Sequence, residues 1–306
     1  MSAGDLFMAI ECFHNARQIA ESSGNNHLRA KAELYLIDVS MTMGNYSLAL
    51  KAVSALESDP IYIEDKITKL KIDLRKAKLL QALGDCEAST RLAEGVSKSA
   101  GLLGKRRLAL EAEIVFADSR LELLEYESAE THKVIFSKAK KNNLADLVAE
   151  LQLSLAKYYK EHEINENALH YFEALCMNRS APERVKLEAE LGRIDIMENS
   201  CQHEAITARL TEMEDKAASS GYIGIAALAA HILGRLHLRQ GRIDLYEDCG
   251  CRLEGYRRKL LTGIPKGFKA DRYRKRLILP SLDNQSTSNE NTISAVDPET
   301  AVVGEK

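Results

Sequence analysis

Hydrophobic residues recur at helical spacing through most of the chain. Before a Gly-Asn pair at 44–45 the apolar positions include Leu34, Ile37 and Met41, and after it they are Ala49, Ala52, Val53 and Leu56. Apolar residues at i, i+3, i+4 and i+7 indicate the buried face of an amphipathic helix. No strand pattern is evident, so this stretch predicts a helix–turn–helix unit.

The unit recurs about every 40 residues. "MTMGNYSLALKAVSAL" (41–56) is followed by "LQALGDCEASTRLAEG" (80–95), and Gly4, Gly44 and Gly84 each precede Asp or Asn. Gly241 continues the series near the end. A mostly small residue holds one column, at Ala9, Ala49, Ser89, Ala129, Ala168 and Ala205. A fixed period of this length indicates a repeat architecture in which stacking buries the apolar face of each unit.

The turn chemistry agrees with this reading. Glycine takes the left-handed conformation that ends a helix, and a following Asn or Asp caps the next one. We therefore expect an all-α array of about six helix pairs over residues 1–262, preceded by an N-terminal helix. Pairs stacking at about 8 to 10 Å would give a superhelix roughly 50 to 60 Å long. Residues 5–23 form either a solitary capping helix or part of a repeat that begins in a longer polypeptide.

The repeats resemble tetratricopeptide (TPR) repeats. Leu233-Gly234 with Gly241, Gly44-Asn45-Tyr46 with Ala49, and Ala156, Tyr159, Ala168, Tyr171 and Phe172 match the family pattern. The resemblance covers residues 4 to about 262 and implies a right-handed superhelical solenoid. The period is about 40 residues rather than the usual 34, which is similar to the TPR regions of bacterial multidomain signalling proteins such as MalT-like activators and kinase-linked arrays.

Composition favours an intracellular, cytoplasmic protein. Hydrophobic residues make up 45% of the chain and charged residues 28%, with no Trp and five Pro. No uninterrupted apolar run of secretory or membrane-spanning type is found. The six cysteines lack a paired spacing, so we expect them to be reduced.

The formal charge of −3 conceals a basic C-terminal segment. Residues 252–276 hold ten Lys or Arg against two acids, and the polar stretch 281–306 that follows is expected to be disordered. The segment 263–280 allows an alternative function, binding to nucleic acid or another anionic surface. Its candidate contacts, with neighbours just before it, are Arg257, Arg258, Lys259, Lys266, Lys269, Arg272, Arg274, Lys275 and Arg276.

No motif points to catalysis, a cofactor or a metal. The S-x-x-K match at Ser137 to Lys140 lacks the companion motifs of serine acyl enzymes. Cys249 and Cys251 are two residues apart on a predicted helix, so their side chains face nearly opposite sides. We therefore expect a protein that is not an enzyme.

The TPR resemblance implies that the first helices line a concave groove. Its register places one charged row there: Asp38, Lys78, Asp118, Lys157, Arg193 and Arg235. One turn earlier stands a mostly apolar row: Leu34, Leu74, Ile114, Leu153, Ala189 and His231. This groove would be acidic and mixed in its N-terminal half and basic in its C-terminal half.

The expected function is a protein–protein interaction scaffold that binds a peptide or helix of a partner, with an acidic or amphipathic segment favoured. The Lys and Asn pairing that clamps a carboxyl terminus in some family members is not seen in this register. The other alternative is a regulatory arm of a larger signalling protein, such as a kinase or transcription activator.

Overall fold

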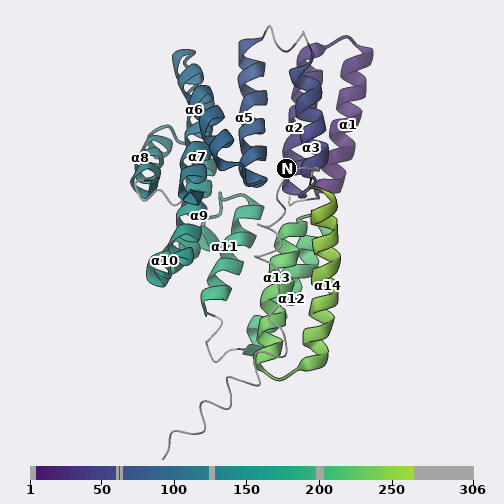
Figure 1. The fold of residues 1–306 in the computed structure, drawn as a ribbon, viewed down its shortest axis with the longest axis vertical. Helices are drawn as coiled ribbons and strands as arrows, with labels where there is room; N and C mark the ends of the chain where they lie inside the picture. The colour runs from purple at the N-terminus through teal and green to yellow at the C-terminus, as the bar shows by residue number, and fades with distance from the viewer. Residues whose placement is uncertain (1–4, 60–61, 63–64, 124–127, 198–202, 265–306) are drawn as a thin grey trace, which may run out of the picture.

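The computed structural model describes residues 5–59, 62, 65–123, 128–197 and 203–264, which contain thirteen α-helices (Figure 1). In chain order these are α1 (Leu6–Ser22), α2 (Asn26–Thr42), α3 (Tyr46–Glu57), α5 (Lys66–Ala82), α6 (Cys86–Leu102), α7 (Arg106–Glu122), α8 (Ser128–Lys141), α9 (Ala145–Glu161), α10 (Asn165–Met177), α11 (Glu183–Ile196), α12 (His203–Ser219), α13 (Ile223–Arg239) and α14 (Ile243–Thr262).

The helices alternate between two roles. The first helices of the pairs are α2, α5, α7, α9, α11 and α13, and the second helices are α3, α6, α8, α10, α12 and α14. Helix α1 precedes them as an unpaired helix. The prediction of an all-α array with about six helix pairs and an N-terminal helix is confirmed.

In the N-terminal half, the N-cap residues of successive helices are evenly spaced, and we call this spacing the capping grid. Asp5, Asn25, Asn45, Asp65 and Asp85 are spaced by twenty residues, and each accepts a backbone N–H of the first turn that follows it. Such caps satisfy N–H groups that have no partner within the helix. The grid therefore has a one-helix period, half that of the predicted repeat.

In several of the turns between helices, the residue directly before the N-cap has a left-handed backbone conformation. Gly44 has φ +79° and Gly84 has φ +86°, as the sequence predicts, and glycines between the pairs do the same. In the turns α8–α9 and α9–α10, Asn143 (φ 56°) and Glu163 (φ 59°) take the place of glycine. The turn geometry thus continues where the glycine does not.

Each first helix packs on two sides. In α9, Ala149, Leu153 and Ala156 contact the second helix of the same pair, whereas Leu147 and Leu151 join the core of the preceding pair. The array consequently has a core that continues from one pair to the next.

The column of small residues is confirmed in part. Ala49, Ser89 and Ala168 are fully buried, as close helix packing requires. Ala205 is instead exposed, and Ile206 takes the packing position in α12. The prediction for Ala205 is therefore wrong by one residue.

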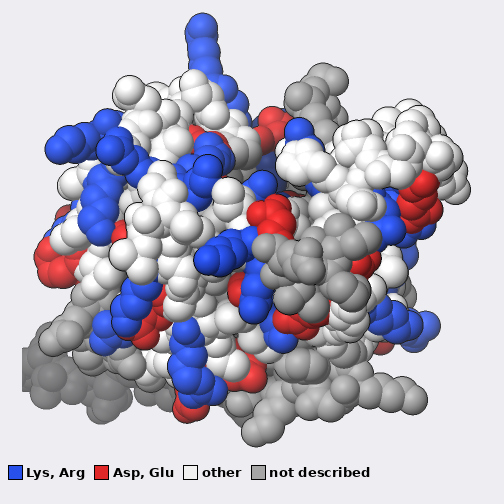
Figure 2. Space-filling model, turned by 90° about the horizontal axis from the view of Figure 1, so that it is seen from above, with Lys and Arg blue, Asp and Glu red and all other residues white. Residues whose placement is uncertain are grey.

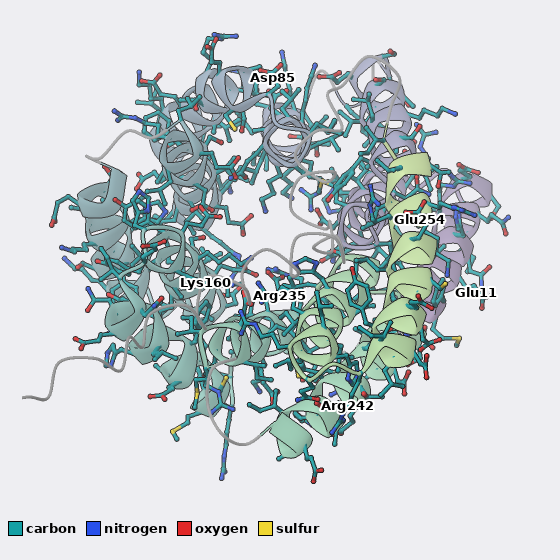
Figure 3. The ribbon with its side chains drawn as sticks, turned by 60° about the horizontal axis from the view of Figure 1, so that its bottom comes forward. Glu11, Asp85, Lys160, Arg235, Arg242 and Glu254 are labelled. Atoms are coloured by element: carbon teal, nitrogen blue, oxygen red, sulfur yellow. The ribbon has the colours of Figure 1, made fainter. Side chains whose placement is uncertain are left out.

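The array curves so far that its two ends meet. The Ser47 N–H donates to the Gly263 carbonyl oxygen at 2.5 Å, and the Leu6 N–H donates to the Ser220 carbonyl oxygen at 3.2 Å. Ile264, just after α14, packs on the core between α2 and α3. Figures 1 and 3 show α14 beside the N-terminal helices and the helices arranged in a ring. The sequence predicted the stack but not this closure.

The described helices include none that is both long enough and apolar enough to cross a membrane. The predicted basic segment beyond Ile264 and the predicted tail 281–306 lie outside the described residues.

Candidate binding cavity

A cavity of about 1140 Å³ lies among the first helices of the N-terminal half. Its walls come from α2, α5 and α7, and the beginnings of α9 and α11 complete it. A volume of this size is at the upper end for small-molecule sites and suits a short segment of chain.

Part of the lining is apolar. Tyr35 is 41% exposed and its ring stacks on Phe13 of α1 at a centroid distance of 5.0 Å. Further apolar side chains in the wall are Leu34, Met41, Tyr46, Ile67, Leu108, Ile114, Val115 and Leu147. The cavity can therefore take up apolar groups as well as charged ones.

Every acid in the lining is paired with a cation or a histidine of the protein. Asp38 binds Arg75 at 2.6 Å, and Asp118 contacts the fully buried His132 at 2.7 Å. Glu111 binds Arg107 at 2.9 Å. The two remaining acids, Asp146 and Glu150, are ion-paired with Arg107 and Arg184. No acid of the lining is free to attract a cationic ligand.

The cations of the lining behave differently. Eight Lys or Arg face five acids there, which gives a formal charge of +3 with His neutral. Four of these cations form no ion pair with the described residues: Lys31, Lys71, Lys105 and Arg106. The face of the molecule seen from above in Figure 2 shows more Lys and Arg than Asp and Glu side chains. The free charge of the cavity is positive.

The start of α7 departs from the capping pattern. Lys105 stands twenty residues after Asp85, at the position where the grid would place an Asp or Asn, and it makes no capping hydrogen bond. Arg106 and Arg107 follow at once, so three cations meet the positive end of the helix dipole. Sequence reasoning missed this cluster, although the twenty-residue spacing of the caps would have singled it out.

The predicted charged row keeps one helix position on five helices and departs from it on one. Asp38, Lys78, Asp118, Lys157 and Arg235 all lie twelve positions after the first residue of their helix. In α11 that position is Asp195, so the register that selected Arg193 is wrong by two residues. Gly192, next to Arg193, packs on Phe172 of the preceding pair.

Asp195 joins the neighbouring helices. Lys160 of α9 and Arg235 of α13 both form ion pairs with its carboxylate. Figure 3 shows Lys160 and Arg235 facing the inside of the ring. With Asp195 in place of Arg193, the row alternates acid and base along all six first helices. The expected basic C-terminal half is therefore not present in this row.

The other members of the row are engaged too. Lys157 binds Glu188 of α11, and Lys78 lies 3.9 Å from Glu111 of α7. Arg193 is half-buried, its Nε forms no hydrogen bond with described residues, and its charge acts on Cys176 of α10. Apart from Asp118, which contacts His132 of α8, the row works first as a series of ion pairs between successive first helices.

The apolar row is mostly part of the core. Leu34, Leu74, Ile114 and Leu153 are at most 7% exposed and pack against their own second helices. Only Leu34 and Ile114 of these also line the cavity.

The apolar row has one further correction, at Ala189, whereas His231 stands at the position of the row in α13. Ala189 packs on the preceding pair, and Leu191 occupies the equivalent position. His231 is half-buried, and burial followed by the charge of Arg235 lowers its pKa to about 4.

Of the predicted basic residues, only three are described. Arg257 and Arg258 form ion pairs with Glu254 on the same helix, and Lys259 is exposed. The others, Lys266, Lys269, Arg272, Arg274, Lys275 and Arg276, lie outside the described residues.

No group of three or more His, Cys, Asp or Glu that could hold a metal ion is found within the described ranges. Cys12, Cys86, Cys176, Cys249 and Cys251 form no disulfide bond.

Comparison with known proteins identifies a similar fold. A solved structure described as "Crystal Structure of Rap Protein Complexed with Competence and Sporulation Factor" matches with a TM-score of 0.60 and 15% sequence identity. The match covers 85% of this chain and 72% of that chain. No family model and no curated protein matches the sequence. The likeness concerns the fold, and it confirms a TPR-like helical-repeat array. The narrower resemblance to MalT-like and kinase-linked arrays stays a prediction.

Proposed function

We propose that this protein is a non-catalytic interaction module that binds a segment of another protein in the cavity formed by α2, α5 and α7. The observation that carries the proposal is the cavity itself, about 1140 Å³ on the inner side of the first helices, where apolar groups alternate with unpaired cations. The similar Rap structure is that of a complex with competence and sporulation factor, which supports a partner-binding role for this fold.

The preferred partner is an acidic or amphipathic segment. It binds in the N-terminal half rather than at Lys157 and Arg235, because those two cations already form ion pairs with Glu188 and Asp195. A partner would have to replace these internal pairs, whereas the cavity offers cations that form no ion pair with described residues.

Site-specific photo-cross-linking tests the proposal. A photoreactive benzoylphenylalanine at Tyr35, in the cavity wall, is compared with the same group at Met177, which is 84% exposed on the outer helix α10. In the native cells we expect one protein to be linked through position 35 and not through position 177. Equal linkage at both positions, or none at position 35, would show that the cavity is not the binding site.

A further inference from the structure

The four unpaired cations of the cavity form two groups on different helices. Lys31 and Lys71 stand at the same position in α2 and α5, five residues after the helix start. At that position the next three first helices carry Glu111, Glu150 and Glu188, and each of these acids is ion-paired with a neighbouring helix. The column is thus basic on α2 and α5 and acidic on the next three first helices, and each of its acids already has a partner within the protein.

The second group is Lys105 and Arg106 at the start of α7. Because residue 105 is Lys, α7 has no side-chain cap. A capping Asp or Asn would stabilise the folded protein by about 1 kcal/mol. No acid among the described residues offsets either charge. Later helices, α9 and α13 among them, also begin without a side-chain cap, so it is the run of adjacent cations, and not the lost cap, that distinguishes the start of α7.

We infer that the cavity binds a peptide segment carrying two acidic groups, one held between Lys31 and Lys71 and the other by Lys105 and Arg106. This inference rests on the proposed function and specifies the partner chemistry. First helices stack about 10 Å apart, so the path from α2 to α7 is roughly 20 Å, or about six extended residues.

A peptide fits this lining better than a nucleic acid does. Apolar side chains such as Tyr35, Ile67 and Leu108 lie beside the cations, and they match side chains between the two acids. Five paired carboxylates also stand in the lining, so its positive surface is divided into separate patches and does not match a continuous run of phosphates. Spaced acidic groups meet the two cation pairs without approaching all of these carboxylates.

The test uses a displayed library of random heptapeptides selected on the full chain. Three double variants are compared with the wild type: Lys31→Gln with Lys71→Gln, Lys105→Gln with Arg106→Gln, and the control Lys51→Gln with Lys69→Gln. The two control lysines are exposed, outside the cavity lining and without an ion pair to described residues. Circular dichroism checks that each variant keeps its helical content.

We expect the selected peptides to carry Asp or Glu at two separated positions. Each cavity variant should abolish the preference at one of them and bind a selected peptide about tenfold more weakly, because two charge contacts are removed. The control variant should bind like the wild type. Changing both acids of a selected peptide to amides should weaken its binding to the wild type. The same change should have little effect on binding to a variant that lacks all four cavity cations, because the charge contacts are already absent there.

Other results overturn the inference in distinguishable ways. In one case, the selected peptides show no preference for acidic residues but compete with cross-linking at position 35. That result would refute the requirement for two acids and leave the proposed function standing. Acidic peptides unaffected by both cavity variants would place the site elsewhere. If a single-stranded oligonucleotide binds through these cations and no peptide is selected, the assignment to a peptide is wrong. If, in addition, no protein is cross-linked through position 35, the proposed function is wrong as well.

Discussion

Gly263, at the end of α14, lies against the backbone of Gly44, in the turn between α2 and α3. A Cβ atom on Gly263 would overlap the carbonyl oxygen of Gly44. The φ of Gly263 is −77°, an ordinary helical value, so glycine is needed here for close approach and not for backbone conformation. This contact joins residues more than 200 positions apart in the sequence and closes the ring.

Gly263→Ala should open this junction. Alanine is favoured over glycine in a helical conformation, so any loss of stability reports the broken contact. We expect a loss of about 1 to 3 kcal/mol in the free energy of unfolding and a larger radius of gyration by small-angle X-ray scattering. The matched control is Gly255→Ala, also on α14, where an added Cβ meets no atom within 4 Å. That variant should be slightly stabilised and unchanged in size, and equal behaviour of the two variants would contradict the closure.

Lys105→Asp should stabilise the protein and weaken ligand binding together. The new carboxylate restores the capping grid and meets the positive end of α7, which is worth about 1 kcal/mol in urea denaturation. Lys105→Ala separates the two effects, since it removes the charge without supplying a cap. If the aspartate variant is no more stable than the alanine variant, the capping interpretation fails.

Acid should weaken the ion pairs between α9 and α11 in a defined range. Burial by itself raises the pKa of Glu188, but the charges of Lys157 and Arg184 outweigh it and hold the pKa at about 2, against 4.5 in an unfolded chain. The folded state therefore gains stability that is complete above about pH 4.5 and is lost as the pH falls toward 2.

Glu188→Gln should flatten that dependence. We expect the variant to lose less stability than the wild type between about pH 5 and pH 3, measured by urea denaturation at each pH. The control is Glu87→Gln on α6, whose side chain is 75% exposed. Parallel curves for the wild type and Glu188→Gln would exclude Glu188 as the source of the acid sensitivity.

His231 should give a second, milder pH dependence. Its pKa of about 4 in the folded chain, against 6.5 unfolded, means that the unfolded state takes up a proton first. Stability is present above pH 6.5 and declines as the pH falls toward 4. His231→Gln should remove this decline, while His170→Gln, at an exposed site on α10, should keep it. Denaturation at about pH 7 and pH 5 distinguishes these results.

Local pattern was sufficient to predict the fold. Apolar spacing and the Gly-Asn or Gly-Asp turns at 44 and 84 fixed the helix pairs, and the structure has them. The ring closure was not predictable in this way, because Gly263 meets Gly44 only through the small rotations that accumulate over six pairs.

The site was predictable in part. Asp38, Lys78 and Asp118 do line the cavity, since the first helices keep one register there. The placement of Arg193 was wrong because α11 begins at Glu183, so that Asp195 is the residue twelve positions into this helix. Lys31 was missed because a charge without an ion-pair partner is identified only once its neighbours in space are known, whereas the spacing of the helix caps does mark Lys105 in the sequence.

Closure also gives the array a fixed copy number. An open solenoid tolerates gain or loss of a unit, since each contacts only its neighbours. Here, one pair more or fewer would move Gly263 away from Gly44 and Ser220 away from Leu6. Duplication or deletion of a pair, the usual route by which such arrays vary, would therefore break both contacts that close the ring.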